Sequence, residues 1–492
     1  MSEKYVLGID QSTQGTKALL FDRKGLLIVR CDLPHKQYIN ESGWVSHDGN
    51  EIYDNILKLI PMVVDKAAID KRNIACIGIS NQRETSIAWD GETGKPIAPV
   101  IVWQCSRARE IAEKLEKDGY NLMVKEKTGI PLSPYFPAAK IAWILRNVEG
   151  AKEMDLAGKL RYGTMDSYLV YRLTGGTSYK TDYSNASRTQ LFNLISLKWD
   201  DVIGKIFGIN IKNLPEVCDS NGNFGETDFN GYLDAKIPIL SVLGDSHGAL
   251  YGQGCHGEGM AKATYGTGSS IMMNIGEKLI HSRHGLVTSL AWGFDGKVQY
   301  VLEGNLNYTG AVISWLKEDL KLIKDAAETE ELALSANPSD TAYLVPAFTG
   351  LGAPYWKNDA KGVLAGMSRT TGKAEIVKAA LDCIAYQITD IVMAMAEDAG
   401  VTMNGLRVDG GPTRNRYLMQ LQSDLTGIPV QVPDVEELSG MGAAYCAGIR
   451  YGLYKKEEIF HKVNRKEFKP SMSSSEREKR YQGWKQAVSM IL

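Results

Sequence analysis

The sequence lacks the features that define several large classes of protein. Its 492 residues contain no uninterrupted apolar stretch long enough to span a bilayer, so we expect no membrane insertion. The formal net charge is only −2, so no basic field is available to attract nucleic acid. The first residues carry no charged and apolar secretion signal, and we therefore expect a cytoplasmic protein.

Cysteine is scarce, and the common phosphate-binding loop is absent. The seven cysteines are scattered and form no Cys-x-x-Cys pair, which argues against a disulfide framework or a zinc site. No Gly-x-x-x-x-Gly-Lys-Ser/Thr motif is present. A nucleotide would therefore have to be held by some other arrangement of backbone and side chains.

Two short turns rich in glycine and hydroxyl side chains lie about half the chain apart. They span residues 8–16 and 264–270, and apolar runs typical of strands adjoin them. Backbone amides around glycine form a concave nest for an anionic oxygen. Such turns also occur in ordinary hairpins for conformational reasons alone. Two of them, one in each half, predict a phosphate chain clamped between two similar lobes.

Asp10 strengthens the phosphate interpretation of the first turn. It ends the predicted strand before the turn, and a carboxylate beside bound phosphate can reach a magnesium ion, which prefers oxygen ligands. We therefore predict Mg²⁺ as a cofactor, with Asp10 as the residue that holds it.

Strand-like apolar runs alternate with amphipathic helices almost throughout the chain. Residues 74–79 and 238–243 are typical of strands, and residues 374–399 predict a long helix. This helix is apolar on more than one face, which indicates burial against a sheet. The alternation predicts an α/β protein with mixed sheets.

The length of the chain predicts two domains. We expect residues 1–250 to carry the phosphate turn and a substrate pocket, and residues 251–492 to bind the nucleotide. Glycines are frequent between residues 244 and 254, and they predict a loosened backbone that acts as a hinge between the domains.

A second set of polar residues follows predicted strands in the first half. Arg83 and Glu84 come soon after residues 74–79, where open α/β sheets collect ligands, and they offer hydrogen bonds to hydroxyl groups. Asp245 follows residues 238–243 and is suited to accept the proton of an attacking alcohol. Taken singly, the first two residues also fit a surface ion pair, and Asp245 fits a helix cap.

Longer stretches resemble the FGGY carbohydrate kinases, and among them the glycerol kinases. The matching segments are residues 81–85, 103–105, 181–189 and 346–356, together with two family signatures, Tyr135 to Asn147 and Gly362 to Asp382. The resemblance covers the entire chain. It implies two actin-like (ribonuclease H-like) domains with a cleft between them.

The resemblance also implies a role for particular residues. The polyol pocket would comprise Arg83, Glu84, Trp103, Tyr135, Asp245, Ser246 and Ser270, with Asp245 as the catalytic base. ATP would be bound by Thr13, Gln14, Gly15, Lys17, Gly266, Thr267, Gly310, Ser314, Gly411 and Asn415. Asp10 would lie by the magnesium ion. The implied reaction transfers the γ-phosphoryl group of MgATP to a primary hydroxyl of a small polyol, as from glycerol to glycerol 3-phosphate.

The sequence departs from the glycerol kinase pattern in three places. Ser246 and His247 stand where two glutamines are usual, Ser270 replaces a bulky aromatic residue, and Ser314 replaces a frequent glutamine. Smaller and more polar groups at 246 and 270 enlarge the predicted pocket. A substrate that leaves the polar groups of a pocket unpaired has a much lower kcat/KM than one that pairs with them. A longer polyol or a ketose, such as a tetritol or xylulose, is therefore the alternative substrate.

The two-lobed architecture also allows a function other than that of a kinase. Actin and the Hsp70 chaperones share the two-lobed architecture and act as ATP-driven switches, because fold alone does not determine function. A switch protein does not require Arg83, Glu84 and Asp245 around a cleft, so these residues favour an enzyme.

We expect a small-molecule polyol or sugar as the binding partner and a homodimer or higher homo-oligomer as the assembly.

Overall fold

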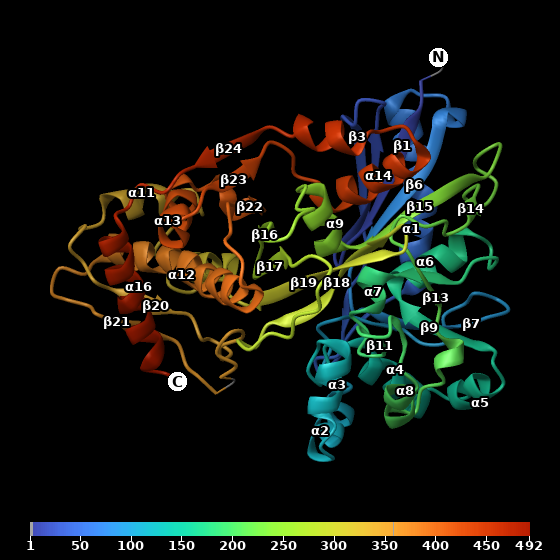
Figure 1. Ribbon diagram of the computed structural model, residues 1–492, viewed down its shortest axis with the longest axis horizontal. Helices are drawn as coiled ribbons and strands as arrows, with labels where there is room; N and C mark the ends of the chain where they lie inside the picture. The colour runs from blue at the N-terminus through green and yellow to red at the C-terminus, as the bar shows by residue number, and fades with distance from the viewer. Residues whose placement is uncertain (1–2, 358) are drawn as a thin grey trace.

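The computed structural model describes residues 3–357 and 359–492, and its core consists of two β-sheets (Figure 1). The first sheet has the strand order β14-β15-β6-β1-β2-β3. Its strands are β1 (Tyr5–Gln11), β2 (Gly15–Phe21), β3 (Leu27–Pro34), β6 (Ile74–Asn81), β14 (Glu226–Thr227) and β15 (Ile237–Gly244). β1, β6 and β15 run parallel, whereas β2 and β3 pair antiparallel.

The second sheet repeats this topology. Its order is β18-β19-β17-β16-β22-β23-β24. The strands are β16 (Ala261–Tyr265), β17 (Ser269–Asn274), β18 (Val287–Phe294), β19 (Lys297–Leu306), β22 (Leu406–Asp409), β23 (Val430–Pro433) and β24 (Arg465–Phe468). The β16–β17 hairpin with parallel β22 and β23 corresponds to the β1–β2 hairpin with parallel β6 and β15. This duplication confirms the predicted pair of actin-like domains, and it places the two glycine turns at equivalent points of the two sheets.

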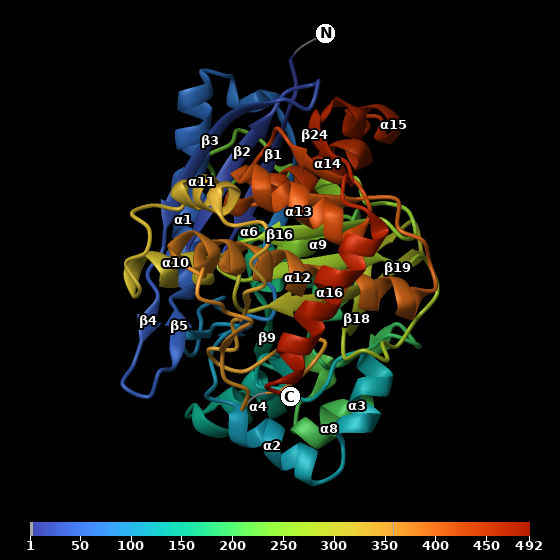
Figure 2. The same ribbon diagram turned by 90° about the vertical axis from the view of Figure 1, so that its left-hand side faces the viewer.

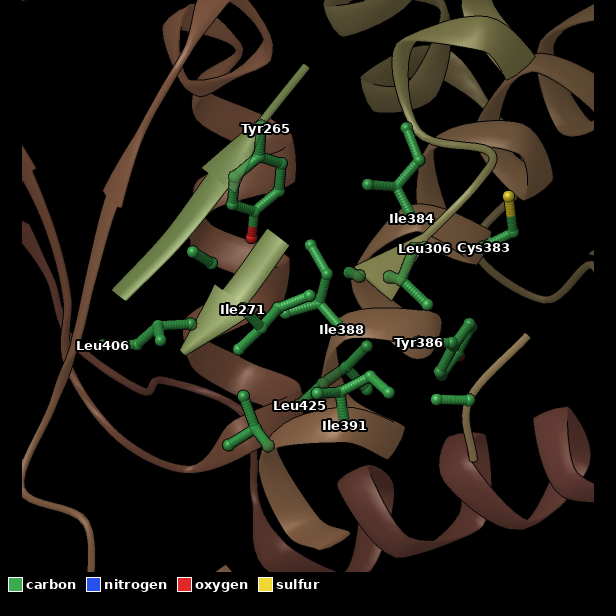
Figure 3. Packing of buried hydrophobic residues seen from close by; sticks show 14 of the residues in the cluster. Tyr265, Ile271, Leu306, Cys383, Ile384, Tyr386, Ile388, Ile391, Leu406 and Leu425 are labelled. Carbon is green, nitrogen blue, oxygen red and sulfur yellow. The ribbon is translucent and has the colours of Figure 1, made fainter. Parts of the chain in front are cut away.

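Helices cover the outer face of each sheet. On the first sheet, α1 (Gly49–Ala67) and α6 (Met165–Leu173) form a core with β1, β6 and β15. On the second sheet, α12 (Lys373–Ala399) and α13 (Arg416–Thr426) form the corresponding core. Figure 3 shows Ile384 and Ile388 of α12 near Ile271 of β17.

Helix α12 confirms the buried helix predicted at residues 374–399. It is the one helix among the described residues that is long and apolar enough to cross a membrane. However, 89% of its most apolar window is buried inside the molecule. Its hydrophobic composition is therefore explained by packing in the core of the second domain.

A smaller sheet extends the first domain at the lower end of Figure 1. Its order is β4-β5-β8-β7-β9. The strands are β4 (Tyr38–Ile39), β5 (Val45–His47), β7 (Ser86–Asp90), β8 (Val100–Ile101) and β9 (Leu160–Thr164). The helices of this region are α2 (Arg109–Lys117), α3 (Asn121–Thr128), α4 (Pro137–Asn147), α5 (Ala151–Leu156) and α8 (Asp201–Phe207), whereas α7 (Tyr183–Ala186) contacts β18 of the second sheet. The extension positions Trp103 and Tyr135 beside the end of β6.

Two helices lie between the sheets: α9 (Asp245–Gly252) and α14 (Leu438–Tyr451) (Figures 1 and 2). Helix α14 belongs to the C-terminal half of the chain, yet Met441 and Ala444 pack with Val6 and Leu19 of the first sheet. The C-terminal segment thus returns to the first domain, and the chain crosses between the lobes more than once.

The predicted loosened hinge at residues 244–254 is wrong in its physical basis. Residues 245–252 form α9, and its glycines permit close helix packing against α14. A Cβ atom at Gly248 would lie 2.8 Å from the carbonyl oxygen of Ser439, and one at Gly442 would lie 1.9 Å from that of Gly248. These glycines therefore tighten the junction, because only a missing side chain lets the two backbones approach.

Candidate active site

The first glycine turn joins β1 to β2 as predicted. The backbone N–H and the hydroxyl of Ser12 both donate to the carbonyl of Gly15, at 2.8 and 2.9 Å. A Cβ atom at Gly15 would lie 2.7 Å from the carbonyl oxygen of Leu33 on the neighbouring strand. Trp103 Nε1 donates to Thr13 Oγ1 at 3.0 Å. This bond connects the phosphate turn directly to a residue predicted for the polyol pocket.

Lys17 lies on β2 just after this turn and is held by acidic groups. Its Nζ is 2.7 Å from Glu437 Oε2, at the start of α14, and 3.9 Å from Asp10 Oδ2. The ammonium group thus lies between Asp10 of the first sheet and Glu437, which precedes α14. It supplies positive charge beside the predicted phosphate position.

The second glycine turn joins β16 to β17 and docks on helix α10 (Gly310–Glu318). Gly310 N donates to the carbonyl of Gly266 at 2.9 Å, and Ala311 N donates to that of Thr267 at 3.0 Å. A Cβ atom at Gly310 would lie 2.7 Å from the Gly266 oxygen, so the close approach requires glycine. The structure therefore brings together three residues predicted to bind ATP.

A cavity of about 890 Å³ opens beside this turn. It lies between α10, α11 (Glu328–Ser335), α12 and the start of α13. Four of the residues predicted to bind ATP line it, namely Gly310, Ser314, Gly411 and Asn415. Cavities of this size accommodate cofactor-sized ligands. The predicted turn residues of the first domain, including Thr13 and Lys17, do not line it.

Arg83 forms the centre of a buried cluster of charges. Its Nε donates to Asp245 Oδ1 at 3.1 Å, and its Nη2 donates to Ser246 Oγ at 3.2 Å. Its two terminal nitrogens also donate to the carboxylate of Glu303 at 2.9 and 2.7 Å. One guanidinium group thus joins the predicted base to a predicted pocket residue and to an acid of the second sheet.

Glu84 is buried and has a left-handed backbone, with φ of 59°. Its Oε1 accepts a 2.6 Å hydrogen bond from Arg188 Nε. Non-glycine residues in this region carry conformational strain, which is frequent at functional sites because the surroundings must hold it in place. Arg188 fixes the side chain of Glu84, and Lys140 fixes its backbone carbonyl.

Lys140 of α4 fixes the backbone of the pocket. Its buried Nζ donates to the carbonyls of Glu84 at 3.2 Å and Trp103 at 3.1 Å, and also to that of Tyr135. Burial lowers the pKa of the Lys140 ammonium to about 7. One side chain thereby ties together three residues predicted for the polyol pocket.

Aromatic rings and serine hydroxyls complete this region. The rings of Trp103 and Tyr135 lie 5.5 Å apart, and burial raises the pKa of the Tyr135 hydroxyl, which stays protonated. Ser246 Oγ and Ser270 Oγ are 3.4 Å apart, and Ser270 Oγ lies 3.5 Å from Glu303 Oε1. The two serines that depart from the glycerol kinase pattern therefore adjoin each other and the charge cluster.

Asp10 is buried and incompletely bonded. Burial raises its carboxyl pKa from 3.8 to about 6, although the nearby Lys17 charge opposes the shift. Its Oδ1 has no hydrogen-bond partner among the described residues. An orphaned, buried carboxylate oxygen fits a divalent cation, which would compensate its charge. Within residues 3–357 and 359–492 no group of three acidic, histidine or cysteine side chains could hold a metal by itself, so phosphate and water would complete such a site.

Sequence reasoning gave no role to three residues of this cluster: Glu303, Arg188 and Lys140. A weak signal exists for Glu303, because it is the single charged residue in the otherwise apolar run from Tyr300 to Gly304. An ionisable residue at a buried strand position needs a partner, and that requirement could have drawn attention to it.

Comparisons with known proteins show the family of this chain. The model of the FGGY family of carbohydrate kinases, N-terminal domain, matches residues 5–252, and the C-terminal domain model matches residues 261–451. The chain is 44% identical over 492 residues to the glycerol kinase of Geobacillus sp. (strain WCH70), covering 100% of this chain and 99% of that protein. It is 45% identical over 492 residues to the glycerol kinase of Caldanaerobacter subterraneus subsp. tengcongensis, covering 99% of each.

Solved structures extend the comparison. The crystal structure of Plasmodium falciparum glycerol kinase with ADP is 34% identical, has a TM-score of 0.94, and is matched over 100% of this chain and 98% of that one. The xylulose kinase of Lactobacillus acidophilus has a TM-score of 0.87 at 21% identity over 99% of this chain and 96% of that one, which shows a shared fold. With both family models matched and long relatives of high identity, this chain belongs to the FGGY family of carbohydrate kinases.

Proposed function

We propose that this chain transfers the γ-phosphoryl group of MgATP to a primary hydroxyl of a small polyol, with glycerol as the first candidate. The observation that carries the proposal is the Arg83–Asp245 pair at the start of α9, where Ser246 Oγ lies 3.4 Å from Ser270 Oγ of the second glycine turn. The glycerol kinases that share about 44% identity with the chain over its full length support the same substrate.

Asp245 is suited to act as the base. Its side chain is 36% exposed, whereas the neighbouring Arg83 and Glu303 are buried. Arg83 Nε and Ser246 N both donate to Oδ1, so Oδ2 is left to accept a proton from the substrate hydroxyl. General-base catalysis of this kind contributes roughly 10²- to 10⁴-fold to the rate.

The other groups bind and orient the reactants. Arg83 and Glu84 would bind substrate hydroxyls, and Trp103 and Tyr135 would pack against the carbon chain. The backbone amides of the two turns and Lys17 would bind the phosphates. Catalysis would rest on positioning and on neutralising charge, because phosphoryl transfer needs little covalent help from the protein.

Asp10 would hold the magnesium ion through its unpartnered Oδ1. When bound, Mg²⁺ neutralises phosphate charge during transfer. The residues Gly310, Ser314, Gly411 and Asn415 would bind the rest of the nucleotide in the cavity beside α10. A cytoplasmic location and a homo-oligomeric assembly remain predictions.

A second candidate substrate is a longer polyol or a ketose, such as a tetritol or xylulose. The adjacent hydroxyls of Ser246 and Ser270 favour it, because they offer additional hydrogen bonds where a bulky aromatic residue would exclude them. A non-enzymatic ATP switch finds no support in the family to which the chain belongs.

A coupled ADP-release assay over glycerol, a tetritol and xylulose tests the proposal. We expect polyol-dependent ADP release that disappears on Mg²⁺ chelation. The Asp245→Asn variant, with nearly the same shape, should lose about 10³-fold in kcat because it cannot accept the proton. Turnover of this variant at the parent's rate would refute the base assignment, and no activity with any polyol would refute the proposed function.

A further inference from the structure

Glu303 is a buried carboxylate of the second domain that forms ion pairs with arginines of the first domain. It lies on β19 of the second sheet, and its side chain is 0% exposed. Its two oxygens accept hydrogen bonds from Arg83 at 2.7 and 2.9 Å, and Arg188 Nη1 lies 2.9 Å from Oε2. Both arginines belong to the first domain, so one acid of the second domain receives two cations of the first.

Each of these arginines also holds a carboxylate of the proposed polyol site. Arg83 bonds to Asp245 at 3.1 Å, and Arg188 bonds to Glu84 at 2.6 Å. Glu303 is thus the common partner behind both pairs. A displacement of its carboxylate would change the direction of the Arg83 guanidinium, because two parallel hydrogen bonds fix that group in plane and in distance.

The two arginines keep Glu303 ionised despite its burial. Burial alone would raise the carboxyl pKa, but the adjacent Arg188 and Arg83 charges hold it well below its usual range. Buried ion pairs add little net stability compared with apolar side chains of similar volume. The main physical consequence of this one is therefore orientation.

We propose that Glu303 is a positioning residue that sets Arg83, and through it the polyol-binding geometry, from the second domain. Glu303 itself need not touch the substrate. Since its partners come from the other lobe, polyol binding becomes dependent on the relative position of the two domains. The inference rests on the proposed function, because it concerns the same polyol site.

The test compares E303Q with the parent chain in steady-state kinetics. Glutamine keeps the shape but removes the charge that holds both guanidinium groups. We expect the KM for the polyol to rise at least tenfold while the KM for ATP changes less than twofold. A purely structural role would move both constants, or only the thermal midpoint.

Asp390→Asn provides a matched control. Asp390 is also a buried carboxylate, bonded by Tyr355, Tyr481 and Trp484, but it lies on α12 in contact with the C-terminal helix α16 (Ser474–Ser489). Its loss should lower the thermal midpoint and leave the polyol KM within twofold. A rise in polyol KM equal to that of E303Q would overturn the proposal.

A double-mutant cycle with R83A separates positioning from an independent effect. If Glu303 acts through Arg83, adding E303Q to R83A should change kcat/KM for the polyol less than threefold. Multiplicative losses in the double variant would overturn the proposal, because independent sites add in free energy.

E303D covers the case in which E303Q does not fold. It keeps the charge but shortens the reach to the two arginines, so we expect a polyol KM raised severalfold, and an unchanged KM would overturn the inference. A parent chain that turns over no polyol refutes the proposed function together with this inference. An active parent whose variants keep the parent's polyol KM refutes the inference alone.

Discussion

The proposed polyol side and the proposed nucleotide side of this kinase differ in how their polar groups are satisfied. On the polyol side, Arg83, Asp245 and Glu303 already bond to one another. On the nucleotide side, residues such as Gly310 and Gly411 line an open cavity of about 890 Å³. One region is a network of paired polar side chains, and the other is an open cavity.

The difference determines what each ligand must do on binding. A polyol must exchange hydrogen bonds with groups that are already paired, so small changes in geometry should affect its affinity. A nucleotide would fill a preformed cavity, which is lined by Gly310, Ser314 and Gly411 together with longer side chains such as Leu381 and Ile384, so steric changes should matter most there. Asp10 shares a feature with each side: its side chain is buried, as in the paired network, but its Oδ1 has no hydrogen-bond partner among the described residues.

After Asp245→Asn, the largest expected effect comes from Asp10→Asn, which should lower activity while it raises stability. Loss of the proposed magnesium ligand should lower kcat at least about 100-fold, since a divalent ion contributes several kcal/mol of transition-state stabilisation. Steady-state kinetics at saturating Mg²⁺ measures this loss.

The same variant should be more stable without ligands. Because the folded pKa of Asp10 is raised to about 6 from 3.8, ionisation destabilises the folded state above pH 6. Asparagine removes that penalty, which builds up between pH 3.8 and 6 and is worth about 3 kcal/mol at pH 8, and the gain should shrink to about 0.6 kcal/mol at pH 4. Urea unfolding at both pH values measures it, and a less stable variant at pH 8 would contradict the buried, orphaned state of this carboxylate.

The cavity side is tested by Gly310→Ala. The new methyl group would lie 2.7 Å from the Gly266 oxygen, so the second glycine turn must move away from α10. We expect the KM for ATP to rise about tenfold, equivalent to about 1.4 kcal/mol, with little change in the polyol KM.

Gly411→Ala is the comparison variant, because a Cβ atom there meets nothing within 4 Å. It should raise the KM for ATP less than Gly310→Ala does. Equal effects of the two substitutions would show that loss of space in the cavity, and not displacement of the turn, weakens nucleotide binding.

The paired side is tested by Ser270→Phe, which adds bulk beside Ser246 and Glu303. The ring should occupy the room of the outer hydroxyls of a longer substrate and leave space for glycerol. We expect the ratio of kcat/KM for glycerol over xylulose to rise about tenfold, the size typical of a change in pocket volume. An unchanged ratio would remove Ser270 as a determinant of substrate length.

Local sequence patterns predicted the parts of the site that are built locally. The two glycine turns, the strand ending at Gly244 and the buried helix α12 follow from runs of neighbouring residues. The sequence could not indicate that Glu303 meets Arg83, because 220 positions separate them. Predicted boundaries also moved by one or two residues: the strand expected over 74–79 is β6 (Ile74–Asn81), and the strand expected over 238–243 is β15 (Ile237–Gly244).

The hinge error has the same origin. Glycine in a sequence signals either backbone freedom or close contact, and only the partner decides between them. For Gly248 that partner is α14, almost 200 residues later in the chain, where the Ser439 carbonyl leaves no room for a side chain. Distant partners are what a single sequence does not supply.

The smallest expected effect concerns His247, which lies next to the paired network. It is fully buried, and neither ring nitrogen has a partner in the described part of the chain. Burial lowers its pKa well below 6.5, and the charges of Arg83, Arg188 and Lys262 add to the shift against the opposing Glu303. The folded state therefore holds this imidazole neutral at pH values where the unfolded chain takes up a proton.

Linkage then gives the sign of the pH dependence. Below pH 6.5 the unfolded state binds more protons, so the free energy of unfolding should fall as the pH falls, by up to about 1.4 kcal/mol per pH unit for one histidine. His247→Gln removes this proton and should flatten the slope between pH 6.5 and 5, while His47 and His256 still contribute. Urea titrations at each pH measure the slope, with the exposed His461→Gln variant as the control for histidine content. Identical slopes for the two variants would mean that position 247 is not the buried neutral base.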